Sequence, residues 1–377
     1  MRREPRNRWR HCLVLLREPE GYLTTTAGQF TQTSMERRPT QADVAKVAGV
    51  HRATVSLVFR NHPSIPATTR EKVLECAKQL GYSPDPMLSS LAAYRSRIRP
   101  KAFQGIIAWL VTDSSWSTVP AFRDSYEGAA AQANTHGFKL DIFKLEEFTD
   151  CRDRLASIFR SRNIHGILLP PSSQPNSVVD FPWEEFSAVK FGFSIINPQL
   201  HTVTSSQFRS TVSTMRQLYL LGYKRIGFFF DRKHDEKTDH NYLGGYFVGT
   251  YCADSLGGIP PLYSFDSKKF LTWYKKYRPD AILTGHRNIL DILDSVGIRV
   301  PEDLGVADPL LESDILGGKV RLAGVYEDSF NIGATAVDFL VGMIYRGERG
   351  LPQQPQRVLI EGVWRPGNTV RAVTGVK

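Results

Sequence analysis

The stretch that most constrains the fold of this chain is DVAKVAGVHRATVSLVFRN, residues 43–61. A first apolar helical run ends at Gly49, and a second run begins after Val50 with polar residues before continuing as ATVSLVF. Glycine adopts the backbone conformations of a tight turn without steric cost. The pattern therefore predicts two short helices whose relative angle is set by the turn between them.

The flanking residues extend this prediction to a bundle of three helices. Thr40 is a suitable N-cap, and Asp43 lies where the helix dipole favours a negative charge. A third helix, TTREKVLECAKQLG, ends at Gly81. The residues predicted to face inward are Ala42, Val44, Ala45, Val47 and Ala48 in the first helix, Val55 and Val58 in the second, and Val73, Leu74, Ala77 and Leu80 in the third.

Three short helices with a tight turn between the first two describe a helix-turn-helix, whose second helix lies in the major groove of DNA. His51, Arg52 and Ala53 then point outward, so Arg52 can bind guanine bidentately and Ala53 can contact a thymine methyl group. The residues suited to phosphate contacts are Thr40, Thr54, Ser56 and Arg60. A small helical subdomain that binds another protein is the alternative.

The charge distribution favours a polyanion as the partner of this end. Residues 36–101 contain twelve Lys or Arg against five acidic residues, and residues 1–35 contain six Arg against three Glu. Beyond residue 101 the basic and acidic residues are equal in number, so the net charge of +10 belongs to the first 101 residues. A neutral body with one basic end is typical of a nucleic-acid-binding module joined to another domain.

Residues 1–35 are predicted to be a disordered or untranslated leader, with translation starting at Met35. The apolar stretch CLVLL is shorter than the roughly 7 to 15 residues that a signal peptide needs. A basic arm that contacts DNA is the alternative.

From residue 103 onward the chain alternates between strand-like and helix-like segments. GIIAWLV and KLDIFKL have the character of strands, and FRDSYEGAAAQANTHG that of an amphipathic helix. Such alternation implies parallel sheets flanked by helices, with ligands bound at the carboxyl ends of the strands.

The segment from Thr40 to Ser96 resembles the head and hinge of the LacI/GalR family of bacterial transcription regulators. The DVA-x-x-AGV turn, the TVS of the second helix, TREKV and LGY-x-P all stand in register. LLGYKRIGFFF, GIRVPEDLGVAD and QRVLIEGVWRPGNTVR extend the likeness nearly to the C-terminus. By this resemblance Arg52, Ala53 and Leu57 read bases. Leu57 stands where the family usually has Arg, so its base contact must be apolar or absent.

The resemblance implies a domain for each region: a helix-turn-helix domain at 36–83, a hinge at 84–102 and an effector-binding and dimerisation domain at 103–377. In the family, two hinge helices pair across a dimer and wedge a Leu into the minor groove. Leu91 matches that position, and a helix-packing role is the alternative.

The body is expected to have the fold of a periplasmic binding protein, with two α/β lobes joined by three crossovers. One lobe is predicted at 103–194 and 326–348, and the other at 195–325 and 349–377. By family position the effector-binding residues are Asp113, Trp116, Phe193, Asn241, His286, Asp308 and Glu327. Asn241 stands where an Arg commonly grips the effector, which removes a bidentate contact and weakens the case for a plain hexose or a purine.

No enzyme, cofactor or metal site is predicted. The chain has no H-E-x-x-H, no G-x-x-x-x-G-K-[ST], no G-x-S-x-G and no strand-linked G-x-G-x-x-G. Its four cysteines are scattered, and no apolar run approaches the about 20 residues of a membrane span. DRKHDEKTDH, residues 231–240, is interpreted as a solvated loop beside the cleft, with a metal site as the alternative.

We therefore expect a cytoplasmic, nucleoid-associated homodimer that binds a palindromic operator in double-stranded DNA. It would repress carbohydrate-utilisation genes under the control of a small-molecule effector, for which a sugar is the candidate. One alternative is an effector-independent regulator with a vestigial pocket. The other is a solute-binding protein without a regulatory role.

Overall fold

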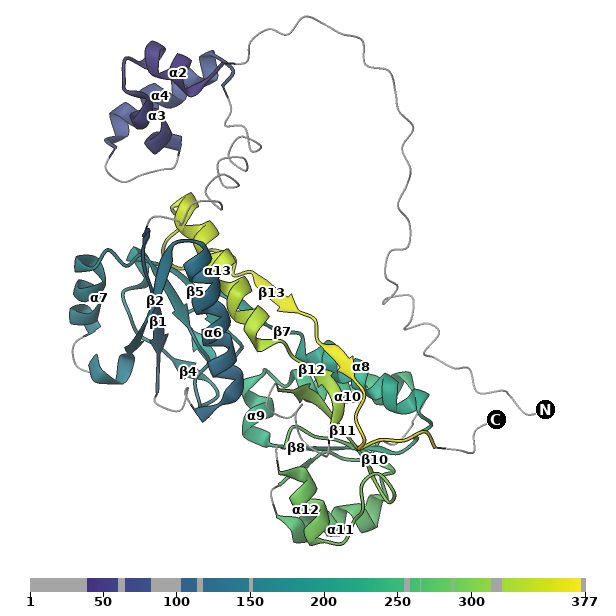
Figure 1. Cartoon of the computed structure of the whole chain (residues 1–377). Coiled ribbons are helices and arrows are strands. Elements are labelled where there is room, and N and C mark those ends of the chain that lie inside the picture. The colour runs from purple at the N-terminus through teal and green to yellow at the C-terminus, as the bar shows by residue number, and fades with distance from the viewer. Residues whose placement is uncertain are drawn as a thin grey trace, which may run out of the picture.

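The computed structural model describes residues 39–59, 65–82, 103–113, 118–148, 152–253, 258–264, 266–286, 288–312 and 321–373 (Figure 1). These residues form a helical head and an α/β body that contains two six-stranded sheets. The leader, the hinge at 84–102 and the predicted site residues Arg60, Leu91 and Trp116 lie outside the described residues.

The head consists of the three expected helices. They are α2 (Gln41–Ala48), α3 (Arg52–Phe59) and α4 (Ala67–Gln79). Gly49 ends α2 in the left-handed conformation with φ 67°, and its N–H donates to the carbonyl of Ala45. The Val50 N–H donates to the same carbonyl at 3.0 Å. This left-handed cap is the tight turn that the sequence predicts between the first two helices.

A single apolar cluster holds the three helices together, and its fully enclosed members are Val44, Ala45, Ala48, Val55, Val58, Val73 and Ala77. The prediction that Ala42, Val47 and Leu74 face inward is wrong, because all three are exposed. At about 100° per residue, Ala42 and Val47 lie roughly 110° to either side of the centre of the stripe formed by Val44, Ala45 and Ala48. An eight-residue helix that packs along one stripe cannot bury all five.

The first sheet of the body is parallel throughout, in the order β13-β7-β5-β3-β1-β2. Its strands are β1 (Gly105–Val111), β2 (Phe138–Lys144), β3 (Gly166–Leu169), β5 (Ser187–Phe191), β7 (His201–Ser205) and β13 (Arg357–Ile360). Helices α6 (Pro120–Thr135) and α13 (Ser329–Arg346) cover one face, and α7 (Arg152–Ser161) covers the other. The short elements are β4 (Ser177–Val178), β6 (Ile195–Asn197), η3 (Leu145–Phe148) and η4 (Trp183–Glu185).

The second sheet has the order β14-β12-β11-β10-β8-β9 and is parallel except for β14. Its strands are β8 (Ile226–Phe230), β9 (Leu262–Tyr263), β10 (Ala281–Leu283), β11 (Gly305–Leu311), β12 (Ala323–Tyr326) and β14 (Val363–Arg365). Helices α8 (Gln207–Leu220) and α10 (Asn241–Cys252) pack on one face, and α11 (Ser267–Tyr277) and α12 (Ile289–Ser295) pack on the other. The predicted fold class, a helical head followed by a two-lobed α/β body, is confirmed.

The chain crosses between the two lobes three times, as the resemblance implies, but two of the crossings differ from the prediction. The first lies between β7 and α8, not at 194/195, because β7 pairs with β5 in the first sheet. The last lies between β13 and β14, not at 348/349, because β13 pairs with β7. The pattern of a strand shows that it is buried and does not show which of two sheets it joins.

Helices α6 and α13 pack closely enough that glycine is required on both. A Cβ atom at Gly128 would lie 1.9 Å from the carbonyl oxygen of Phe330, and one at Gly333 would lie 1.9 Å from that of Ser125. Since backbone atoms cannot move aside as a flexible side chain can, these glycines set the distance between the helices.

None of the helices in the described part of the chain has the length and apolar character of a membrane span.

Replacing Gly333 with Ala should therefore destabilise the body by about 1 to 3 kcal/mol, the usual range for overpacking. Urea unfolding of the purified chain measures the loss. The matched control is Gly342→Ala in the same helix, where a Cβ meets only the flexible Arg346 side chain, at 3.1 Å. The control should be neutral or gain up to about 1 kcal/mol of helix propensity. Equal effects of the two substitutions would contradict the close-packing argument.

Candidate functional site

The start of α3 presents a polar surface to solvent. His51, Arg52 and Ala53 are exposed, as predicted, while Thr54, Ser56 and Leu57 are half-buried. The Ala53 N–H donates to His51 Nδ1 at 3.2 Å, so the imidazole caps the helix. Because Nδ1 is an acceptor here, the ring proton sits on Nε2 and can be donated outward. Sequence reasoning placed His51 on the surface and missed its capping role.

The N-terminus of α2 is closed by a local hydrogen-bond pair. The Thr40 N–H and hydroxyl both donate to Asp43 Oδ2, at 2.8 and 2.7 Å. Thr40 is exposed, and its hydroxyl proton is already used by this carboxylate. A phosphate contact by Thr40 would therefore have to break the bond from its hydroxyl to Asp43.

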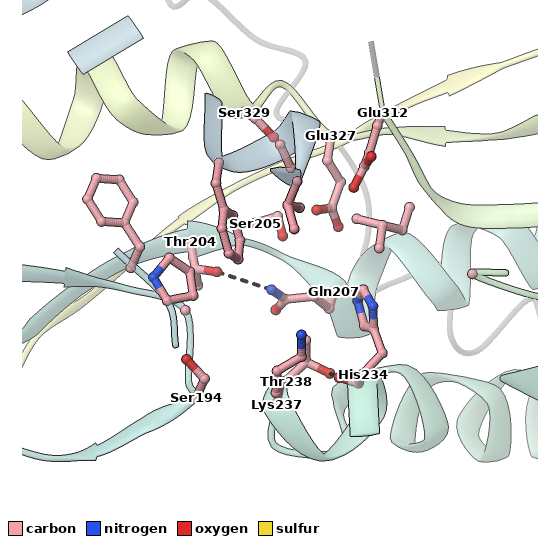
Figure 2. A pocket seen from close by; sticks show the side chains of 18 of the residues that line it. Ser194, Thr204, Ser205, Gln207, His234, Lys237, Thr238, Glu312, Glu327 and Ser329 are labelled. Carbon is pink, nitrogen blue, oxygen red and sulfur yellow. Dashed lines mark hydrogen bonds between the residues drawn. The ribbon is translucent and has the colours of Figure 1, made fainter. Parts of the chain in front are cut away.

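The body contains a cleft of about 620 Å³ between its two lobes. From the first lobe it is lined by the ends of β1, β3, β5 and β7 and by the start of α6, and from the second by residues that follow β8, β10, β11 and β12. Both sets lie at the carboxyl ends of parallel strands, where open α/β sheets bind their ligands. Figure 2 shows side chains from both lobes around this cavity.

Four of the predicted effector residues line the cleft: Phe193, His286, Asp308 and Glu327. Asp113 and Asn241 are not among the lining residues. Asp113 accepts a hydrogen bond from the Ser173 N–H at 3.0 Å, and Asn241 donates to the carbonyl of Thr238 at 2.6 Å. Both side chains thus hydrogen-bond to backbone groups next to the cleft. Asp113 does so from the loop after β1, and Asn241 does so from the first position of α10.

The segment 231–240 is not a solvated loop. Asp231 accepts from the Lys233 N–H at 2.9 Å and so caps α9 (Arg232–Lys237), which directs His234 and Lys237 at the cleft. Within the described part of the chain, no group of His, Cys, Asp and Glu could hold a metal ion. The sequence did not predict that His234 and Lys237 line the cleft, because the six residues of α9 are too few to show the periodicity of a helix.

A buried carboxylate holds α9 in place. Asp235 is fully buried, and its Oδ2 lies 2.8 Å from His240 Nδ1 and accepts from the Tyr263 hydroxyl at 2.7 Å. The Leu243 N–H donates to its other oxygen at 3.2 Å. These bonds link α9 to α10 and to β9. They therefore fix the position of the helix backbone from which His234 and Lys237 point at the cleft.

Two histidines of the cleft are uncharged at neutral pH. Burial lowers the pKa of His234 to about 4, and burial also lowers the pKa of His286. His286 packs its ring against Phe229, with the centroids 4.6 Å apart. Neutral imidazoles can both donate and accept hydrogen bonds, so these two residues suit a polar ligand without adding charge.

Glu327 is a buried acid of the cleft whose pKa is shifted far from its ordinary value. It is 6% exposed, it is hydrogen-bonded to the Ser205 side chain, and the Tyr242 hydroxyl donates to it at 3.4 Å. Burial raises its pKa to about 8, and the nearby Asp308 carboxylate adds to the rise. It follows β12 directly, at the second crossing, whereas Ser205 ends β7 at the first crossing. One carboxyl group therefore joins two of the three connections between the lobes.

A helix-turn-helix head joined to a two-lobed α/β body with a cleft between the lobes defines a class of DNA-binding regulators. Residues 40–85 match the family model of bacterial regulatory proteins, lacI family. The HTH-type transcriptional regulator KdgR of Bacillus subtilis (strain 168) is 22% identical over 331 residues, which cover 82% of this chain and 92% of KdgR.

Two solved structures share the fold. The lac repressor dimer bound to operator and the anti-inducer ONPF matches with a TM-score of 0.53 and 17% identity, covering 89% of this chain and all of the other. The complex of the transcriptional regulator CelR with cellobiose matches with a TM-score of 0.52 and 20% identity, covering 88% of this chain and all of the other. Residues 40–85 thus match the DNA-binding domain of the LacI family, and over most of its length the chain is similar to transcription regulators such as KdgR.

The raised pKa of Glu327 predicts how stability depends on pH. Between the unfolded value of 4.5 and about 8, the folded chain holds a proton that the unfolded chain releases, so this group makes stability fall as pH rises. A glutamine at this position cannot titrate. Glu327→Gln should therefore remove this decrease in the free energy of unfolding with pH, which is on the order of a few kcal/mol.

Urea unfolding of both chains from pH 5 to pH 8.5 measures this difference. The control is Glu147→Gln, a change of an exposed glutamate in η3 with a side-chain exposure of 59%. Its profile should follow that of the unmodified chain. A Glu327→Gln profile as steep as that of the unmodified chain would show that Glu327 is ionised in the folded state.

Proposed function

We propose that this protein is a dimeric repressor of carbohydrate-utilisation genes that binds a palindromic operator and is controlled by a small-molecule effector in the interlobe cleft. The observation that carries this proposal is the pairing of an exposed polar helix start on the head with a cleft between the lobes of the body that combines apolar and polar side chains. We place the protein in the cytoplasm, at the nucleoid, because its operator lies there.

On this proposal the head reads DNA through α3. Arg52 binds guanine in the major groove, Ala53 contacts a thymine methyl group and Leu57 makes an apolar contact or none. Their exposure supports these roles, since Arg52 and Ala53 are exposed and Leu57 is half-buried. The phosphate contacts are assigned to Thr40, His51, Thr54, Ser56 and Arg60.

The domain roles follow the same division. Residues 36–83 form the DNA-binding domain, residues 84–102 are the hinge, with Leu91 as its minor-groove wedge, and residues 103–377 bind the effector and dimerise. The lobes are joined only by the three short crossings of the described chain, which allows closure around a ligand by small changes in backbone angles. A ligand that binds the closed form better shifts the body toward it, and the hinges report the shift to the heads.

The effector contacts are assigned to Phe193, His286, Asp308 and Glu327, with Trp116 as a further contact by family position. A vestigial pocket is the second possibility. The size of the cleft favours a ligand, as does the buried indole Nε1–H of Trp109, which has no hydrogen-bond partner in the described structure. A solute-binding protein without a regulatory role is disfavoured by the helix-turn-helix head.

Selection of binding sites from random DNA sequences, followed by gel-shift titration, tests the proposal. The full chain should recover a palindrome, and a chain that lacks residues 1–101 should not bind it. Recovery of no sequence, or equal binding by the shortened chain, would exclude the proposed function.

Arg52→Ala should weaken binding to the selected operator by about 1 to 3 kcal/mol and relax the preference at one base position in each half-site. Repeating the selection with the variant measures this. The control is Lys78→Ala, an exposed basic residue of α4, which should leave the base preference unchanged. If Arg52→Ala weakens binding equally on all sequences, Arg52 is a phosphate contact.

A further inference from the structure

We propose that the effector is an organic cation, a polyhydroxylated amine of the amino-sugar type, whose ammonium group pairs with Glu327 and whose oxygen atoms accept a hydrogen bond from Trp109. This inference rests on the proposed function, because it names the ligand class of the same cleft. It is carried by the chemistry of the two walls, by the surroundings of Glu327 and by a buried donor in Trp109.

The two walls of the cleft differ in character. The wall from the first lobe has no charged residue among its described members, which are aromatic, proline and small aliphatic side chains, a glycine and several hydroxyls. Its polar members are Ser125, Ser172, Ser194, Thr204, Ser205 and Ser329. Aromatic faces and hydroxyls together are suited to a ligand with a carbon framework that carries many oxygen atoms.

All the acids of the cleft belong to the wall of the second lobe. They are Asp231, Asp308, Glu312 and Glu327. Lys237 is the one Lys or Arg among the described residues that line the cleft. Burial and the neighbouring Lys233 lower the pKa of Lys237, whereas Asp231 and Asp113 act against this, so the acids that act on Lys237 are these two.

Glu327 lies away from Lys237. In the view of Figure 2, Glu312 and Glu327 lie along one edge of the cavity and Lys237 and Thr238 along the opposite edge, with Gln207 and His234 between them. The groups that act on the Glu327 carboxyl are the Ser205 and Tyr242 side chains and the Asp308 carboxylate. Among the described residues, no cation contributes to its ionisation.

A buried carboxyl group in such surroundings favours a cationic ligand. Desolvation opposes its ionised form, and a neighbouring carboxylate opposes it further. A ligand ammonium group at hydrogen-bond distance would supply the missing opposite charge and a directed N–H donor. A neutral hydroxyl supplies only the hydrogen bond, and an acidic ligand would meet like charges.

Trp109 provides an independent sign of a bound oxygen atom. Its side chain is fully buried and lines the cleft, packed against Tyr126 and Phe191 with centroid distances of 5.5 and 5.2 Å. Its indole Nε1–H has no hydrogen-bond partner in the described structure. Indole is a donor only, so a ligand hydroxyl or ring oxygen would satisfy it, whereas a simple alkyl ammonium group would not.

The size of the cleft agrees with this class. A volume of about 620 Å³ lies within the range of small-molecule sites and is large enough for a mono- or disaccharide. The amine then spans the cleft, with its hydroxylated framework on the first lobe and its ammonium group at the crossing that carries Glu327.

The test uses the full chain and matched ligand pairs. Glucosamine, galactosamine and mannosamine are compared with glucose, galactose and mannose, and with the N-acetyl derivatives, by thermal shift at millimolar concentration and then by calorimetry. At least one amine should bind. Its neutral parent and its N-acetyl derivative should have dissociation constants at least roughly 30-fold higher.

Three variants locate the contact. Glu327→Gln should remove the preference for the amine over its parent. Trp109→Phe should weaken both ligands and keep the preference, because it removes a donor to oxygen. Glu147→Gln, the same change of charge on the surface of the first lobe, should bind like the unmodified chain.

Proton release on ligand binding can be measured with the unmodified chain, so this test does not require a variant to fold. Because Glu327 holds its proton below a pKa of about 8, binding an ammonium group at pH 7 should expel that proton. Calorimetry in two buffers with different ionisation enthalpies measures the release, and the neutral parent sugars should show none.

The inference is overturned if no amine of the panel binds, if a parent sugar binds as tightly as its amine, or if amine binding releases no proton. These outcomes leave the proposed function standing, since operator selection and gel shifts are measured without effector. Conversely, if the chain selects no operator but prefers an amine, the proposed DNA-binding function is refuted and the proposed ligand class stands.

Discussion

The joint between the two lobes is the constraint on which the rest of the body depends. The chain passes between the lobes from β7 to α8, from β12 to α13 and from β13 to β14. Each connection is short, so the lobes can rotate only by small dihedral changes at these points. The same connections place the carboxyl ends of both sheets opposite each other, and this opposition creates the cleft.

The chemistry of the cleft is a consequence of that joint. Glu327 and Ser205 stand at two of the crossings, so their hydrogen bond links backbone segments that a closing motion would displace. Burial at the joint also raises the pKa of Glu327. A ligand that changes the ionisation of this group would act at the point where the two lobes are coupled, which is where a small contact has the largest effect on their arrangement.

Much of the fold could be predicted from the sequence because its signals are local. Gly49 ends α2 in the left-handed conformation that the turn needs, and Val55 and Val58 anchor α3 at the expected spacing. Strand-helix alternation indicated parallel sheets flanked by helices, and the family resemblance implied their division into two lobes. The site was only partly predictable: Phe193, His286, Asp308 and Glu327 line the cleft, but Trp109, His234 and Lys237 were missed. Trp109 looks like an ordinary core residue in its strand, and α9 is too short to show a period.

By itself, the sequence determined the elements and their order, since capping, turns and hydrophobic periodicity act between residues that are near in the chain. Only the tertiary structure decided which sheet β7 and β13 join and which side chains of the body face one another. It also decided that Glu327 is buried beside Asp308. Those properties depend on contacts between residues far apart in the chain, where desolvation and Coulomb interactions are set by the packed surroundings.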